Sequence, residues 1–510
     1  MSTLNSYTCR ALELRTAEYY AHIRKPESEW KTIEDLAPQL AEFEHLVKAG
    51  EYDAACQVLD SNATHLFIWG YYALLVAMRK TLVGKIQSLT LQLNNLEGMA
   101  DALRAIGELQ SAIAHYEQGL ILAHHLGDRA REAKLQGDLG SAYRVLGQRE
   151  KSLALYESAL AISREIGDRR EECRQLGHLG RIYGVLGRFT QAIESHKQAI
   201  EIARETNNRQ LEGYNLGTLG NIHRALGQFE TARTLYEMAL MIAYEIGERR
   251  EEGIRHRSLG EIYRVLGNTE KAITFFQIAL ARSRDIAYRV GEENTLGSLG
   301  NVYIDLEDCE KAQEYHTEAL RISREIGYRT GQEYSVLGLA RIKLATDNLT
   351  EAQQLCEEAL SLYAEEVDYH IALILGIVYL RQKSAKASEI IQDAILCCQR
   401  LLTQYREWYA PQYVFATALV GQAVCGSRWL DPPQRTDLLA PALAEYRRAL
   451  DITSAPGVVR DALRDLGLIR AAGIKGLEPA FVLLEQAISD WQPLSDDALP
   501  SPTSSQEDTL

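Results

Sequence analysis

Histidines and paired carboxylates are the residues of this chain that could transfer protons or bind a metal ion. His124 and His125 adjoin within a helical pattern, so their side chains diverge by about 100° and do not suit joint ligation of one metal. Adjacent glutamates recur at the start of successive helical patterns, where the helix dipole favours negative charge: Glu171-Glu172, Glu251-Glu252 and Glu292-Glu293. A catalytic pair has no reason to recur. We therefore predict no catalytic residue, no metal site and no cofactor, and hence a protein that is not an enzyme.

Nucleotide binding would require a recognisable phosphate-binding loop. Such a loop consists of Gly, four further residues and then Gly-Lys-Ser or Gly-Lys-Thr, so that backbone amides and the lysine converge on phosphate. The nearest match is Gly84-Lys85-Ile86, in which Arg79 stands in place of the upstream glycine and no hydroxyl follows the lysine. The sequence therefore does not predict nucleotide binding.

The dominant feature of the chain is a register of forty residues. A glycine preceded by leucine recurs at Gly140, Gly180, Gly220, Gly260 and Gly300. A column of arginines has the same spacing: Arg129, Arg169, Arg209, Arg249, Arg289 and Arg329. A fixed period of this length indicates one supersecondary unit stacked on copies of itself. The sequence therefore predicts a solenoid.

Each repeat has the pattern of two amphipathic helices. In residues 168–207, apolar positions at three-to-four spacing fall into two runs, which Gly187 separates. Because a glycine closes a helix at the least steric cost, we expect helices to end at the glycines of both turns. These are Gly147, Gly187, Gly227 and Gly267 after the first helix, and Gly127, Gly167, Gly247 and Gly327 after the second. Asp128 and Asp168 are placed to cap the helix that follows.

The residue types at these positions resemble the tetratricopeptide repeat. The Leu-Gly pair matches its pattern, as do the alanine, aromatic and Ala-Leu positions of the second helix, for example Ala232, Tyr236 and Ala239-Leu240. The match covers roughly residues 95–365, with forty residues per repeat in place of the usual 34. Longer repeats of this kind resemble those of kinesin light chains, of Leu-Gly-Asn scaffolds and of the sensor arms of bacterial STAND signalling ATPases. The resemblance implies an all-α fold, a right-handed superhelical solenoid of antiparallel helix pairs.

Histidines and cysteines within the repeats are predicted to pack in the core. His196, His223 and His316 stand where sister repeats carry Tyr or Phe. Cys173 replaces an alanine or glycine of the sister repeats, and Cys356 replaces a tyrosine, so both are expected to be packed thiols.

Net charge and hydropathy limit which classes of partner and which cellular compartment we expect. The net charge of -15 argues against general binding to nucleic acid or to an anionic membrane. The longest apolar run, residues 66–78, is too short to span a bilayer, and residues 1–5 lack the order of a signal peptide. We therefore expect a soluble, cytoplasmic protein whose partner is a protein or peptide, with no nucleic acid and no membrane.

The register divides the chain into four predicted parts. They are a helical N-terminal linker or cap (1–94), the regular array (95–365), degenerate helical pairs with a C-terminal cap (366–488) and a disordered tail rich in Ser, Pro and Asp (489–510). Residues 9–93 resemble the helical linker that joins the nucleotide-binding core of STAND ATPases to their repeat arm, and an ordinary helical cap is the alternative. The resemblance implies an alternative function, the regulatory or sensor arm of such an ATPase switch without its nucleotide-binding core.

The arginine column needs partners, because an arginine beside a helix N-terminus opposes the helix dipole. A glutamate three residues later is within reach in five repeats: Glu132, Glu172, Glu212, Glu252 and Glu292. We interpret the column as structural struts between repeats. Ligand contact is the alternative.

The resemblance also implies which side chains form the inner wall of the solenoid, namely positions 134, 137, 141, 144 and 145 and their equivalents forty residues on. The basic residues at these positions are Lys134, Arg144, Arg174, Arg181, Arg224, Arg257, Arg264 and Arg341, against the acids Glu261 and Asp305. Groups for hydrogen bonding are Tyr214, Asn221, Asn294, Asn301 and Tyr334. Glycines at 137, 177, 217 and 297 indicate room for ligand side chains or tight helix contact.

The basic excess of this wall, in an acidic protein, predicts its ligand. We expect an interaction scaffold that holds an acidic, extended peptide or partner surface in the concave groove by charge-assisted hydrogen bonds. The alternative is that these arginines are solvated or paired with acids across repeats.

Overall fold

The computed structural model describes residues 2–362, 368–404, 408–425 and 432–491, and every structural statement below concerns these residues. They form 24 α-helices and two short 3-10 helices, η1 (Glu27–Glu29) and η2 (Ile33–Leu36), with no strand among them. The all-α prediction is confirmed. The predicted disordered tail lies outside the described residues from 492 onward.

The chain forms two compact units, residues 1–211 and 212–510. The first unit holds α1 (Ser2–His22), α2 (Ala37–Ala49), α3 (Tyr52–Ile68), α4 (Tyr72–Leu82), α5 (Leu89–Ala105), α6 (Leu109–Leu126), α7 (Arg129–Val145), α8 (Arg149–Glu165), α9 (Arg169–Val185) and α10 (Phe189–Glu205). Helix α11 (Arg209–Ala225) begins at the end of this unit and continues into the second.

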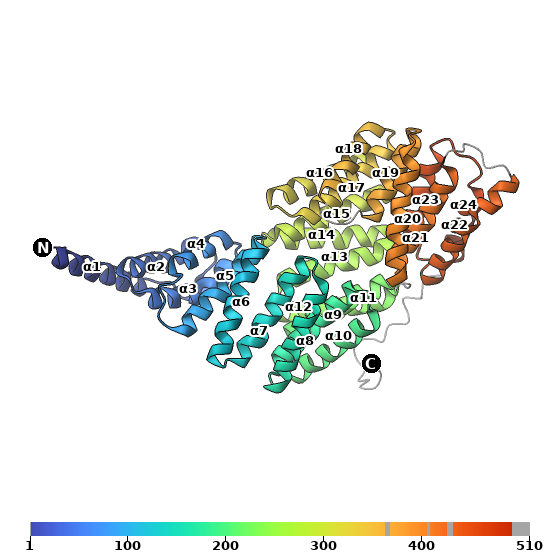
Figure 1. Cartoon of the computed structure of the whole chain (residues 1–510). Helices are drawn as coiled ribbons and strands as arrows, with labels where there is room; N and C mark the ends of the chain where they lie inside the picture. Colours follow the sequence, from blue (N-terminus) through green and yellow to red (C-terminus); the bar gives the residue numbers. More distant parts are fainter. Residues whose placement is uncertain (1, 363–367, 405–407, 426–431, 492–510) are drawn as a thin grey trace. The chain divides into compact units, whose positions relative to one another are not determined.

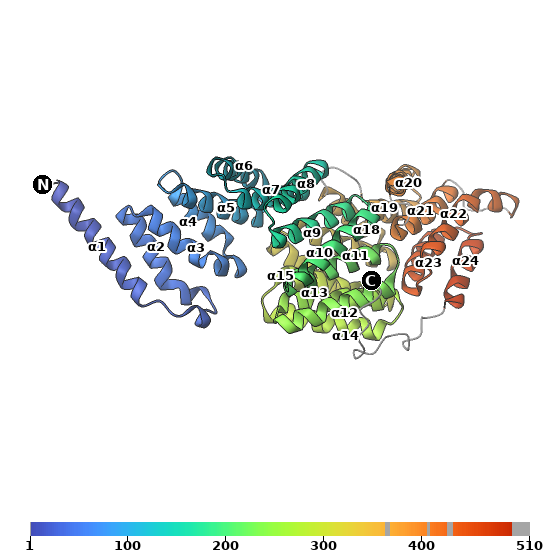
Figure 2. The same cartoon turned by 90° about the horizontal axis from the view of Figure 1, so that it is seen from below.

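The second unit continues the same pattern of helix pairs. It holds α12 (Phe229–Ile246), α13 (Arg249–Val265), α14 (Thr269–Asp285), α15 (Arg289–Asp305), α16 (Cys309–Glu325), α17 (Arg329–Ala345), α18 (Leu349–Ser361), α19 (Tyr369–Arg381), α20 (Lys386–Gln404), α21 (Tyr409–Val424), α22 (Pro432–Ile452), α23 (Pro456–Arg470) and α24 (Glu478–Asp490). Within each unit, consecutive helices run side by side in antiparallel pairs (Figures 1 and 2). This confirms the solenoid of helix pairs, whereas the boundaries at residues 94, 365 and 488 stay predictions. From α5 onward, odd-numbered helices are called first helices and even-numbered ones second helices.

Glycine and aspartate set the turns as predicted. Gly147, Gly187 and Gly227 lie in the left-handed region at φ 78°, 62° and 71°, where a residue without Cβ is favoured. The Asp128 carboxylate accepts a hydrogen bond from the Arg131 amide at 3.1 Å and so caps α7.

The glycine of each Leu-Gly pair lets an aromatic ring of the second helix lie directly on the first helix. A Cβ on Gly260 would stand 2.6 Å from the fully buried Phe276 ring, and one on Gly220 would stand 2.6 Å from the Tyr236 ring. His196 and His316 take the same buried place, which confirms their prediction as core residues.

The prediction for His223 is wrong. This ring is half-buried near the end of α11, and its Nδ1 lies 2.6 Å from the side-chain oxygen of Gln228 in the following turn. It follows Leu219-Gly220 as the tyrosines of the sister repeats do, and that position faces the turn between the two helices.

The arginine column ties together the two ends of one repeat. Arg169, at the start of α9, pairs with Glu172 at 2.6 Å and with Glu205, at the end of α10, at 2.5 Å. Arg289 repeats the arrangement with Glu292 and Glu325. The column was predicted to join neighbouring repeats, and here the structure differs. The ion pair between neighbouring repeats is made instead by an arginine of the preceding second helix, as in the 2.8 Å pair of Arg164 with Glu172.

The described residues also bear on the predictions for the cysteines and for membrane-spanning helices. Cys173 and Cys356 are buried free thiols, as predicted. No described helix has the length and apolar character that a bilayer crossing requires.

Two glycines of α13 test the ring-on-glycine contact. Gly260→Ala should destabilise the protein by about 1–3 kcal/mol, because the added methyl would overlap the Phe276 ring. Gly253→Ala is the matched control, because its Cβ would meet neighbours only at 3.5 Å and beyond, and an alanine favours the helix by up to about 1 kcal/mol. Thermal unfolding followed by circular dichroism measures both, and equal melting temperatures would refute the contact.

Candidate functional site

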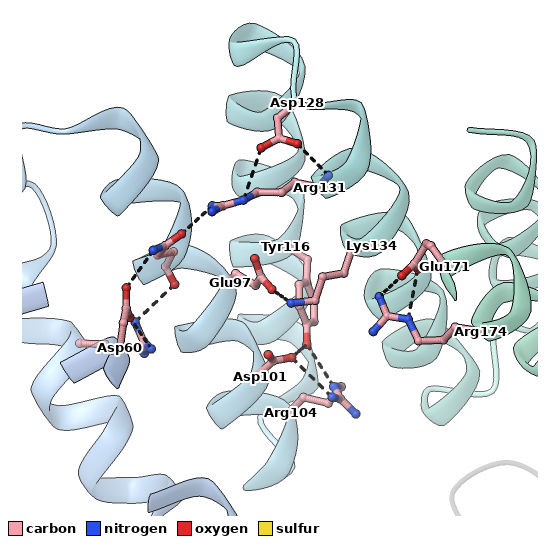
Figure 3. Close-up of polar contacts among 12 residues, drawn as sticks. Asp60, Glu97, Asp101, Arg104, Tyr116, Asp128, Arg131, Lys134, Glu171 and Arg174 are labelled. Atoms are coloured by element: carbon pink, nitrogen blue, oxygen red, sulfur yellow. Dashed lines mark hydrogen bonds and ion pairs between the residues drawn. The ribbon is translucent and has the colours of Figure 1, made fainter. Parts of the chain in front are cut away.

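The first helices of unit 1 carry a row of charged side chains on one face. Lys134 of α7 pairs with Glu97 of α5, and Arg174 of α9 pairs with Glu171 of its own helix at 2.5 Å (Figure 3). Both basic residues belong to the predicted wall, but both acids were absent from the prediction. The wall therefore carries less positive charge than the sequence count implied.

A partly buried hydrogen-bonded cluster lies beside this row. The Tyr116 hydroxyl donates to Asp101 at 2.5 Å, and the Arg104 guanidinium donates to the Tyr116 oxygen at 3.1 Å (Figure 3). Asp138 of α7 lies close to the same groups. Burial, and then the Asp101 charge, raise the pKa of Asp138 to about 6, although Arg174 and Lys134 oppose the shift.

A second polar network extends this face to the preceding helices. Arg131 donates to the Asn94 side-chain oxygen at 2.6 Å, and the Asn94 amide donates to Asp60 at 2.9 Å. Asp60 also pairs with Arg79 of α4 at 3.1 Å (Figure 3). The guanidinium of Arg79 also fills the space above Gly98. At this end of the wall, Arg131, Asn94, Asp60 and Arg79 thus bond to one another.

His178 of α9 lies near three arginines of the predicted wall. Its ring stacks on the Tyr156 ring at 5.1 Å between centroids. Burial, together with the nearby guanidinium groups of Arg181, Arg174 and Arg144, holds the pKa of His178 well below its usual value. The guanidinium groups of three predicted wall residues therefore lie near one buried ring between α7 and α9.

In unit 2 the predicted arginines already have acidic partners. Arg264 of α13 pairs with Asp305 at 2.9 Å, with Glu261 at 3.4 Å and with Asp461 of α23 at 3.5 Å. Arg341 of α17 pairs with Asp465, also of α23, at 3.6 Å. For these two residues the alternative interpretation, pairing with acids, is the one observed.

A cavity of about 300 Å³ lies inside unit 2. Side chains of α13, α15, α17, α21 and α23 line it, together with the start of α19. It brings together four residues of the predicted set: Arg264, Asn301, Tyr334 and Arg341. Asn301 donates a hydrogen bond to the Tyr334 hydroxyl at its edge.

The other predicted residues of unit 2 do not line this cavity. Asn294 donates back to the Val290 carbonyl of its own helix at 2.8 Å. Asn221 accepts a hydrogen bond from Tyr236 at 2.7 Å, and Arg224 lies close to the same tyrosine. Arg257 lies near Glu261 and Glu293. Tyr214 is half-buried on α11.

The wall glycines serve close helix contact. A Cβ on Gly137 would stand 2.3 Å from the Gln175 side chain of α9, and one on Gly217 would stand 2.0 Å from Arg255 of α13. A side chain of the next first helix therefore fills the space above each of these two glycines. Of the two predicted roles, tight helix contact is the one observed there, and no room is left for a ligand side chain.

Sequence reasoning missed the acids that balance the wall. Glu97 and Asp101 stand forty residues before positions 137 and 141, so extending the register by one repeat would have found them. Asp138 also lies on the wall face, although its position was not counted. Asp461 and Asp465 follow no register, so the sequence offered no signal for them. Among the described residues, no group of three or more His, Cys, Asp or Glu side chains could hold a metal ion.

Asp138 gives a pH-dependent prediction. Its folded pKa of about 6 lies above the usual value of 3.8, so the fold binds its proton more tightly than the unfolded chain does. The ionised form therefore costs stability above pH 6, and this cost vanishes as the pH falls below 6 toward 4. Asp138→Asn should raise the melting temperature at pH 8 and lose this advantage at pH 4.5. A lower melting temperature of the variant at pH 8 would contradict the shift.

Comparisons with known proteins agree with this architecture. A tetratricopeptide-repeat family model matches residues 90–165 and 172–245, and the model of a MalT-like tetratricopeptide region matches residues 216–394. Together these matches cover more than half of the chain. None of the curated proteins compared with this chain matches it.

Solved structures with similar folds share little sequence with this chain. A STAND protein with a tetratricopeptide-repeat sensor from Pyrococcus horikoshii is 19% identical, with a TM-score of 0.44 over 70% of this chain and 52% of that one. This chain thus spans about half the length of that protein. Aspartyl phosphate phosphatase F from Bacillus subtilis is 14% identical, with a TM-score of 0.48 over 71% of this chain and 95% of that one.

A kinesin light chain from Podosopora anserina with nearly identical tetratricopeptide-like repeats is 19% identical, with a TM-score of 0.33 over 39% of this chain and 98% of that one. The forty-residue register, the ring-on-glycine contact and the two family models lead to the same assignment. The chain belongs to the tetratricopeptide-repeat proteins.

Proposed function

We propose that the chain is an interaction scaffold whose unit 1 wall binds an acidic segment of a partner protein. The observation that carries the proposal is the group of arginines from α7 and α9 around the neutral His178. Arg144, Arg174 and Arg181 are the predicted wall residues that lie near this ring, while Lys134 lies further toward α5, where it pairs with Glu97. A carboxylate at this place would replace part of the hydration of several guanidinium groups at once.

The partner's charge follows from the local balance of the wall. Toward α5 each basic group meets an acid, such as Glu97 against Lys134. Near His178 lie the guanidinium groups of Arg144, Arg174 and Arg181, and the ring itself adds no positive charge because its pKa is held well below its usual value. An acidic peptide or loop fits this end, and its binding should weaken with salt because the wall is half-exposed.

The wall of unit 2 can bind the acidic partner only after its arginines lose their present ion pairs with α23. Arg264 and Arg341 are available to a partner once Asp461 and Asp465 no longer pair with them. The other predicted residues of unit 2 are held by neighbours or lie outside the cavity, and they remain secondary candidates for contact with the partner. They are Tyr214, Asn221, Arg224, Arg257 and Asn294.

A second candidate function is the sensor arm of a STAND-type ATPase switch. Its support is the resemblance of residues 9–93 to the linker of such proteins, a segment that forms helices α1 to α4 next to the repeats. An ATPase domain supplied by another chain would then be the partner. Co-purification of this chain with a protein that carries a phosphate-binding loop would favour this function.

Charge reversal on the wall tests the scaffold proposal. A photo-crosslinking amino acid at Val145, which is 54% exposed at the end of α7, captures the partner in source cells, and mass spectrometry identifies it. Arg174→Glu with Arg181→Glu should reduce the affinity for the identified acidic segment at least tenfold, because two attractive charges become repulsive.

The matched control is Arg149→Glu with Lys197→Glu, an equal change of charge at exposed positions on the second helices α8 and α10. This control should retain binding. Equal losses in both double variants would show that net charge acts in place of a site, and unchanged binding in the wall variant would refute the proposal.

A further inference from the structure

Helix α23 closes the row of first helices in unit 2. It lies against its neighbour α21 and also contacts α13 and α19, although almost two hundred residues separate α23 from α13. The contact with α13 is at backbone level, because a Cβ on Gly457 would stand 2.4 Å from the Arg264 carbonyl oxygen. The following turn also takes part, since Gly267 lies against Pro456.

The charges on α23 match those of the wall. Asp461 and Asp465 are four residues apart and so lie on one face of the helix. Asp461 reaches Arg264 of α13, and Asp465 reaches Arg341 of α17, two repeats further along. Between them, Arg464 pairs with Asp305 of α15 at 2.5 Å. Three successive first helices thus each contribute one ion pair to α23.

Apolar contacts complete this arrangement. Val458 and Ala462 of α23 are buried and line the same cavity as Leu337 of α17. One face of α23 therefore presents both carboxylates and small apolar side chains to the wall. An amphipathic helix bound in the groove of another protein presents its contact face to the groove in the same way.

We propose that the wall formed by α13, α15 and α17 is a groove for an acidic helix, and that α23 is its intramolecular occupant, which a partner helix with carboxylates four residues apart must displace. The inference rests on the proposed binding of an acidic partner. It changes the expected shape of that partner at this wall from an extended peptide to a helix, and it adds autoinhibition.

The space inside unit 2 makes the two occupants exclusive. A helix of fifteen residues is about 22 Å long and about 10 Å wide, so it fills roughly 1,700 Å³. The cavity that remains beside α23 measures about 300 Å³. A partner helix therefore binds this wall only after α23 has left it.

Tethering sets the size of the inhibition. An occupant on the same chain acts at an effective concentration of about 1 mM. For a helix with a dissociation constant of about 10 μM, such a competitor weakens binding in trans about a hundredfold.

The test uses a fluorescent, acetylated and amidated peptide of residues 456–470 as the probe, with the full-length chain. Gly457→Leu should release α23, because the side chain meets the backbone of Arg264 and Val265. Gly467→Ala is the control in the same helix, since a Cβ there meets nothing within 4 Å. The probe should bind the Gly457→Leu chain at least tenfold more tightly than the wild type or the control. A probe carrying Asp461→Asn and Asp465→Asn should lose this gain.

A second variant guards against misfolding. The full-length chain with Asp461→Asn and Asp465→Asn removes the charge contacts without adding volume, and it too should bind the wild-type probe more tightly than the wild-type chain does. Hydrogen exchange should show faster exchange of residues 456–470 in both variants. Released α23 without any gain in probe binding would overturn the inference. If the partner captured through Val145 still needed Arg174 and Arg181 in that case, the proposed function would stand while the groove assignment fell.

Discussion

The close approach of a second-helix ring to a first-helix glycine is the contact on which the structure depends. Five times along the chain a buried tyrosine, histidine or phenylalanine lies over the glycine of a Leu-Gly pair, as Phe276 lies over Gly260. A side chain at that glycine would separate the two helices by the thickness of a methyl group. Because these repeats share the same short separation, the first helices within each unit align in a row, and their outward residues form one wall in that unit.

Polar contacts then fix each repeat and balance its wall. Arg169 joins the start of α9 to the end of α10, while Arg164 joins consecutive repeats through the shared Glu172. Ion pairs between helices also occur on the wall, where Lys134 and Arg264 each pair with an acid of another helix. Around His178, guanidinium groups of α7 and α9 come together on this wall.

Local rules made the repeats predictable. The turn glycines, the capping aspartates and the buried rings depend on contacts within one repeat, so their types and spacing reveal them. Charge balance on the wall depends on neighbours in space. Glu97 and Asp101 could have been found by extending the register, but Asp461 and Asp465 meet Arg264 and Arg341 only because the row of helices curves until α23 meets α13. That curvature is the sum of small rotations between repeats, which no residue pattern states.

The central claim is that partners bind the wall of first helices and that α23 covers part of it. Hydrogen exchange on the full-length chain, with and without the partner captured through Val145, tests this most directly. The account predicts slower exchange in α7 and α9, faster exchange in residues 456–470 when the partner also engages the α13 to α17 wall, and no change in the second helices α8 and α10. Protection confined to the second helices, with α7 and α9 unchanged, would contradict it.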